Sequence, residues 1–182
     1  MAFRTVSAVS SRPGNFSRGD RFSFYSGGGR QFSMTVDNWC KMTGIKTSAA
    51  VKKIVIDIFS RVIMRTPVDT GRARSNWVVG LNSPSSTPSS NLDKDPGPVT
   101  SDGTGKSKAK SRMIMKVKTA NVENTKSYIL TNNVVYAIRL EYGWSRRQAP
   151  SGMVRITLRE FNRAVQRVAS EIKKGNITVG GE

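Results

Sequence analysis

The sequence contains no histidine and only one cysteine, Cys40, among its 182 residues. The absence of histidine excludes the nucleophile–histidine pairs of hydrolases and every metal site built on HExxH spacing. One cysteine forms neither an intrachain disulfide nor a thiolate zinc cluster, so nothing indicates a disulfide-stabilised secreted domain. We interpret Cys40, which follows Trp39, as a small apolar residue.

Long hydrophobic runs are also absent. The longest, at residues 54–59, is far shorter than the roughly 20 apolar residues that cross a bilayer. The first residues contain no apolar stretch of the kind that signal peptides carry. We therefore expect no membrane contact and a protein that is intracellular or part of an assembly.

Acidic residues are scarce, with 12 against 30 basic ones, which gives a formal net charge of +18. Such a charge favours polyanions or acidic protein surfaces as partners and makes copies of the chain repel one another. The four carboxylates that could serve an acid–base pair show no DxD or ExxH spacing; they are Asp57, Asp69, Glu141 and Glu160. We therefore expect no enzyme and no cofactor or metal. Asp69 is interpreted as a turn former, and Glu141 as an arginine partner or a helix cap.

Composition divides the chain into an arm and one domain. Residues 1–36 are rich in Ser, Gly and Arg and contain scattered aromatics, which indicates an extended arm that docks on its own body or on a neighbour; a frayed tail fits equally well. Residues 37–182 are predicted to form a single α+β domain. Residues 82–106, rich in Ser and Pro, are predicted to be a flexible insertion in it.

Hydrophobic periodicity predicts the elements of this domain. A long helix at residues 47–64 has an apolar face wide enough to be covered on more than one side, by a sheet or a second subunit, and Pro67 ends it. Residues 107–122 favour an amphipathic helix over an exposed strand. The remaining predicted elements are strands at 75–81 and 127–132, a short helix at 136–143 closed by glycine, and an amphipathic helix at 153–174. The expected fold is a small antiparallel sheet packed against the long helix and the C-terminal helix.

Two features invite a phosphate-binding interpretation. Gly105-Lys106-Ser107 resembles the end of a P-loop, but Thr100 stands where the first glycine belongs and no apolar strand precedes it, so a loop is the better interpretation. A row of arginines steps by four along the last predicted helix: Arg155, Arg159, Arg163 and Arg167. These arginines could contact phosphates, but a solvated face or a face against acidic protein is the stronger expectation.

Two segments together resemble a known family. Residues 65–77, RTPVDTGRARSNW, are similar to the turn that leads into the first strand of a tail-component family of long-tailed bacteriophages. Residues 132–143, NNVVYAIRLEYG, are similar to a second element of that family, and residues 148–154 continue the pattern. Ala73 stands where a larger apolar residue is common, and Val135 replaces a frequent proline.

The resemblance implies a tail-completion or head–tail joining protein of the phage neck, located in the virion and assembled in the host cytoplasm. Members are small α+β units that form rings, commonly hexameric. The implied partners are other copies of the chain, a tail terminator or tail tube protein, and head-completion or connector proteins, with nonspecific contact to genomic DNA in the lumen. The implied scaffold and interface residues are Pro67, Asp69, Thr70, Gly71, Arg72, Trp77, Tyr136, Glu141, Gly143 and Pro150. The alternative is a basic protein that binds nucleic acid nonspecifically as a free molecule.

Overall fold

A computed structural model describes residues 47–85, 94–121 and 124–174. The predicted arm at residues 1–36, Cys40 and the middle of the predicted insertion lie outside these described residues.

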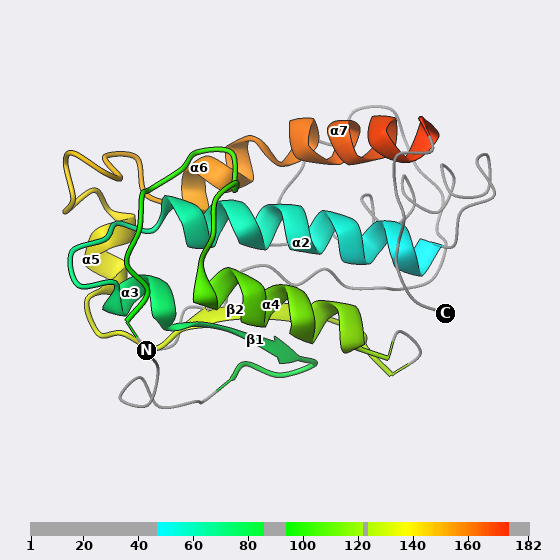
Figure 1. Ribbon diagram of the computed structural model, residues 1–182, viewed down its shortest axis with the longest axis horizontal. Coiled ribbons are helices and arrows are strands. Elements are labelled where there is room, and N and C mark those ends of the chain that lie inside the picture. Colours follow the sequence, from blue (N-terminus) through cyan, green and yellow to red (C-terminus); the bar gives the residue numbers. More distant parts are fainter. Residues whose placement is uncertain (1–46, 86–93, 122–123, 175–182) are drawn as a thin grey trace, which may run out of the picture.

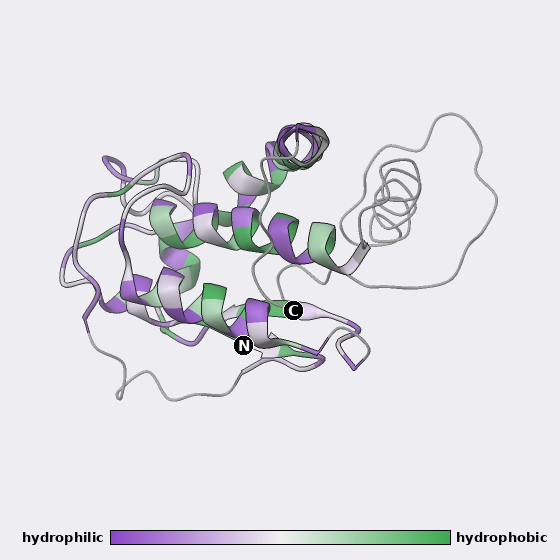
Figure 2. Ribbon diagram, turned by 45° about the vertical axis from the view of Figure 1, so that its right-hand side comes forward, coloured by the Kyte–Doolittle hydropathy of each residue, from purple (hydrophilic) through white to green (hydrophobic). Residues whose placement is uncertain are grey.

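Helix α2 (Thr47–Arg65) forms where the sequence predicts a long helix, and it runs through the centre of the described part of the molecule. Its apolar side chains are buried around much of its circumference, among them Ile54, Ile58, Phe59 and Ile63. Figures 1 and 2 show α7 (Phe161–Lys173) on one side of α2 and α4 (Lys108–Thr119) on the other. The expectation that this helix is covered on more than one side is therefore confirmed, but the cover is two helices of the same chain and not the sheet or second subunit that the sequence suggested.

Residues 108–119 form a helix, as the sequence favours, and their burial explains why a strand is disfavoured. Met113 and Val117, four residues apart, are buried, whereas Met115 between them is 66% exposed. Burial at a spacing of four places one face against the core in a helix, whereas a strand would bury every second residue. Helix α4 contacts α2 on one side and strand β1 on the other.

The sheet of the described residues has two antiparallel strands, β1 (Trp77–Leu81) and β2 (Tyr128–Asn132). Trp77 lies opposite Asn132, and Leu81 lies opposite Tyr128. The short helix α3 (Arg72–Ser75) precedes β1, so the strand begins at Trp77, two residues after the predicted start at Ser75. The predicted α+β class is confirmed, with α4 lying between the hairpin and α2.

The C-terminal helix is interrupted, which the sequence did not predict. Helix α6 (Val154–Arg159) ends at Glu160, and α7 begins at Phe161. The Glu160 carboxylate accepts a hydrogen bond from Arg65 at 2.7 Å and lies 3.6 Å from Arg61, and both arginines are buried on α2. Figure 2 views α7 nearly along its axis while α2 crosses the page, so α7 lies across α2. The ionic contacts of Glu160 coincide with the change of direction between α6 and α7.

Residues 94–106 differ from the flexible loop that composition predicts. The guanidinium of Arg74 is fully buried and donates hydrogen bonds to the carbonyls of Gly97 at 3.1 Å and Pro98 at 3.0 Å. The Thr100 amide donates to the Met64 carbonyl at the end of α2, at 3.0 Å. Burial lowers the pKa of Arg74 from its ordinary value, and the nearby Asp95 opposes that shift. The buried guanidinium of Arg74 therefore attaches residues 94–106 to the rest of the domain.

Candidate functional site

The turn of the first motif is held by close backbone contact. Gly71 has a φ of 81°, in the left-handed region that glycine adopts at no steric cost. Its carbonyl accepts hydrogen bonds from the amides of Ser75 at 3.0 Å and Asp95 at 3.3 Å. Asp69 was expected to bond local amides, but its carboxylate is exposed and makes no such bond among the described residues. Gly71 and the loop beyond it, instead of Asp69, determine this turn.

Trp77 ties the turn to the end of α2. Its indole Nε1–H donates to Thr66 Oγ1 at 2.7 Å, and the Thr66 hydroxyl donates to the Val62 carbonyl at 2.9 Å. Both side chains are buried. The geometry agrees with the expectation that Trp77 anchors packing.

The second motif ends in a glycine cap that positions an aromatic ring. Helix α5 (Ala137–Glu141) is followed by Gly143 at a φ of 84°. The Gly143 amide donates to the Leu140 carbonyl at 3.2 Å, and the Trp144 amide donates to the Arg139 carbonyl at 3.0 Å, which is the Schellman pattern. This pattern turns the residue after glycine back over the last turn, so the Arg139 guanidinium lies 5.3 Å from the Trp144 ring centroid.

Glu141 caps the next helix, as predicted. Its buried carboxylate accepts hydrogen bonds from the amides of Met153, Val154 and Arg155 at 3.0, 2.8 and 2.8 Å. The Nε of Arg155 lies 3.3 Å from the same carboxylate. The first turn of α6 leaves backbone N–H groups unpaired, and one carboxylate satisfies three of them.

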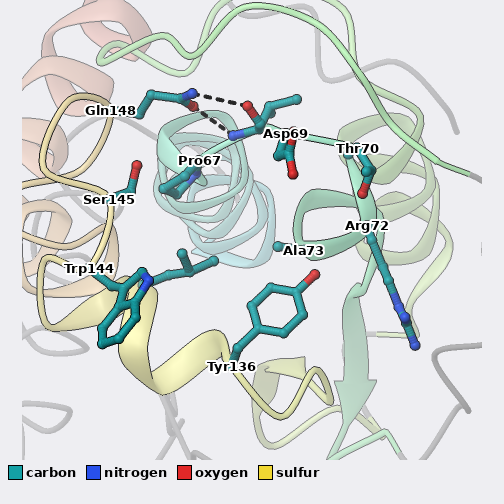
Figure 3. A pocket seen from close by; sticks show the side chains of 12 residues that line it. Pro67, Asp69, Thr70, Arg72, Ala73, Tyr136, Trp144, Ser145 and Gln148 are labelled. Atoms are coloured by element: carbon teal, nitrogen blue, oxygen red, sulfur yellow. Dashed lines mark hydrogen bonds between the residues drawn. The ribbon is translucent and has the colours of Figure 1, made fainter.

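Gln148 joins the two motifs. Its side-chain amide accepts a hydrogen bond from the Val68 amide at 2.7 Å and donates one to the Val68 carbonyl at 3.0 Å. A cavity of about 350 Å³ opens beside this pair (Figure 3). Its lining is Pro67, Val68, Asp69, Thr70, Gly71, Arg72, Ala73, Tyr136, Leu140, Trp144, Ser145 and Gln148.

The structure therefore divides the predicted motif residues into two groups. Six of them line the cavity: Pro67, Asp69, Thr70, Gly71, Arg72 and Tyr136. The other four shape the surrounding backbone or core: Trp77, Glu141, Gly143 and Pro150. Tyr136, expected to anchor packing, is 38% exposed and forms a wall of the cavity. A Cβ on Gly143 would lie 2.6 Å from the Pro150 carbonyl oxygen, so only glycine at position 143 allows the Pro150 backbone to lie this close.

The predicted row of arginines is not uniform. Arg155 is engaged by Glu141, and its guanidinium lies 4.9 Å from the Tyr142 ring centroid. Arg159, Arg163 and Arg167 are exposed, but the interruption at Glu160 separates the first of them from the other two. Arg155 therefore stabilises the protein itself, and the other three arginines of the row present their charge to solvent.

The segment that resembles the end of a P-loop, residues 105–107, lies just before helix α4. The N-terminus of α4 follows Ser107, where a P-loop would hold phosphate. The Asp95 carboxylate occupies this position and accepts hydrogen bonds from Ser107 Oγ at 2.6 Å and from the Ala109 amide at 2.9 Å. A protein carboxylate thus takes the place that a nucleotide phosphate would need.

Sequence reasoning missed several residues of the site, namely Leu140, Trp144, Ser145 and the pairing of Gln148 with Val68. Trp144 follows a glycine that was expected to close a helix, and the Schellman pattern is the signal that could have placed its ring. No three His, Cys, Asp or Glu side chains lie close enough to hold a metal ion in the described ranges. None of the helices in these ranges has both the length and the apolar character needed to cross a membrane.

No family model matches the sequence, and neither a curated protein nor a solved structure shows detectable similarity to it.

Proposed function

We propose that the protein is a structural component of the neck of a long-tailed bacteriophage. It completes the head-proximal end of the tail and joins it to the head connector. It acts by forming a ring, of six copies by the family resemblance, and by binding neighbouring proteins. Its place is the virion, after assembly in the host cytoplasm.

One observation carries the proposal. The two segments on which the family resemblance rests are far apart in the sequence, yet both line one cavity, and Gln148 from the continuation of the second bonds the backbone of the first. If the two segments served only to form the hydrophobic core, we would expect them to pack together without a cavity between them. Exposed aromatic and arginine side chains surround it, and these residue types are enriched where protein interfaces bind most strongly.

Deletion of the gene from the phage that encodes it tests this proposal. We expect filled heads and complete tail tubes that fail to join, and restored infectivity when the intact chain is supplied in trans. Trans-supplied Gly71→Ala, which distorts the motif turn, should restore fewer infectious particles than the similar substitution Gly105→Ala outside the motif. Normal joining of heads to tails without the chain would refute the proposal.

A nonspecific nucleic-acid-binding protein is the second candidate, favoured by three exposed arginines, Arg159, Arg163 and Arg167. If these bind phosphates, changing all three to glutamine should lower the slope of log affinity against log salt by about 0.9 for each phosphate that the variant no longer neutralises. Mobility shifts on arbitrary duplex DNA would measure this. Strong binding by the monomer together with absence from particles would favour this candidate over the neck protein.

A further inference from the structure

The cavity between the two motifs, called the socket below, has room for at least one side chain. Ala73 contributes only a methyl group to its lining, while Tyr136 and Trp144 form walls that are 38% and 71% exposed (Figure 3). Exposed aromatic rings beside an apolar recess are unfavourable in water unless a partner covers them. The Arg139 guanidinium lies over the Trp144 ring, a contact that favours this orientation of the ring and so lowers the entropy cost of binding.

The surroundings of the socket are positively charged. Arg139, Arg146 and Arg147 are exposed on α5 and the loop that follows it. Ser145 and Gln148, which flank the last two arginines in the sequence, line the cavity. Among the lining residues, Asp69 is the one acid and Arg72 is the one base, and both are exposed. An occupant that brings negative charge would gain from this field.

We propose that this socket binds an acidic segment of a different protein, with one apolar side chain inserted between Tyr136 and Trp144 and carboxylates against Arg139, Arg146 and Arg147. The inference deepens the proposed neck function, on which it rests for the location of that partner, by giving the chemistry of the partner's contact segment. Arginine forks bind carboxylates through two parallel hydrogen bonds, which gives such a contact direction as well as charge.

The same features disfavour two other occupants. A second copy of this chain carries a net charge of +18, so the contacts between copies in the proposed ring are expected on surfaces other than this positive one. Single-stranded nucleic acid binds through a succession of open ring faces along a groove. The Trp144 ring already has Arg139 against it, and the recess is one discrete cavity.

Fluorescence anisotropy of the full chain with a labelled synthetic peptide tests the proposal. The probe is a short run of glutamates around one central leucine, and the matched probe has glycine in place of that leucine. We expect the leucine probe to bind about tenfold or more tightly than the glycine probe, because only leucine buries an apolar side chain in the recess. Binding should weaken as salt is raised, because the remaining contacts are ionic.

Three variants locate the binding. Ala73→Leu adds three carbons to the lining of the recess, Trp144→Ala removes an exposed wall, and the pair Arg146→Glu and Arg147→Glu reverses the charge of the surroundings. Each should weaken the leucine probe about tenfold or more. The controls are Ser111→Leu and the pair Lys116→Glu and Lys118→Glu, all exposed on α4, and they should bind the probe like wild type. Trp144→Ala keeps the test valid if Ala73→Leu fails to fold, because its side chain is exposed.

Other results overturn the proposal. Equal binding of the probe by wild type and all three variants, or no binding at all, would mean that the cavity is not the site. Loss of oligonucleotide binding in Ala73→Leu and Trp144→Ala would assign the cavity to nucleic acid, and loss of self-association in them would assign it to a second copy. Probe binding at the cavity by a chain that is absent from particles would leave this inference standing and refute the neck function alone.

Discussion

The backbones of Gly71 and Asp95 lie in direct contact, so that a Cβ on residue 71 would be 2.5 Å from the Asp95 carbonyl carbon. The Asp95 amide donates to the Gly71 carbonyl at 3.3 Å, while the Asp95 carboxylate caps α4. Through these two residues the motif turn, the loop at 94–106 and the start of α4 depend on one another. The turn is thus fixed by a distant segment as well as by its own residues.

Gly71→Ala should lower the free energy of unfolding by about 3 kcal/mol or prevent folding. About 1–2 kcal/mol comes from the left-handed backbone, and the rest from displacing Asp95. Gly105→Ala is the control, since Gly105 has a φ of 89° but its nearest neighbour is the flexible end of Met64, 3.1 Å away. Urea denaturation measures both variants. Equal losses would mean that the contact with Asp95 contributes nothing.

Glu141→Gln should destabilise the protein by about 3 kcal/mol, because hydrogen bonds to a charged group are strong and the amide NH2 that replaces one oxygen is a donor facing one or two of the three N–H groups. Glu171→Gln is the matched control; its carboxylate lies 3.8 Å from Lys53 at the surface, and such pairs contribute below about 1 kcal/mol. Chemical denaturation compares the two. A decrease in stability in Glu141→Gln no larger than in the control would contradict the capping role.

Arg74→Lys should destabilise the protein by about 3 kcal/mol and release the loop at 94–106. A lysine has three donors on a single nitrogen and cannot reach carbonyls on Gly97, Pro98 and Thr66 together. Hydrogen exchange at the Thr100 amide gives the local readout, which should accelerate more than exchange in the core of α2. The exposed Arg72→Lys serves as the control, and equal exchange in the two variants would refute the role of Arg74.

Tyr128→Phe should reduce the loss of stability at alkaline pH. Burial raises the pKa of the Tyr128 hydroxyl above its ordinary value of 10.0. The unfolded chain therefore releases this proton at lower pH than the native protein does, so the stabilisation is complete below about pH 10 and is lost as pH rises through the native pKa. Stability curves from pH 8 upward measure the effect. Tyr142→Phe, at a side chain 67% exposed, controls for removal of a hydroxyl, and parallel curves for wild type and Tyr128→Phe would contradict the prediction.

Elements with clear periodicity were predictable from the sequence. Helix α2 and strands β1 and β2 follow from local apolar spacing, whereas the spacing in α4 fitted a strand as well and only favoured a helix. Glu141 was expected either to pair with an arginine or to cap a neighbouring element, and it does both. The helices and strands could be predicted because residues close together in the sequence determine them. The role of Glu141 could be predicted because a carboxylate among many arginines has few possible partners.

The features that were missed depend on contacts between distant residues. Arg61 and Arg65 look like a solvated face of α2, yet both bind Glu160 where α6 gives way to α7. Nothing in the sequence distinguishes Arg74 from the many other basic residues, yet it binds the loop at 94–106, whose composition indicates flexibility. Gln148 pairs with Val68 at the cavity, and no local sequence pattern marks that pairing.

Electron cryomicroscopy of purified phage particles, with the chain labelled by a fused tag, tests the central claim most directly. The account predicts a ring of this protein between the head connector and the tail tube, with the cavity at residues 67–73 and 136–148 against a neighbouring protein of another sequence. Mature particles that lack the chain, or that carry it anywhere other than the head–tail junction, would contradict the account.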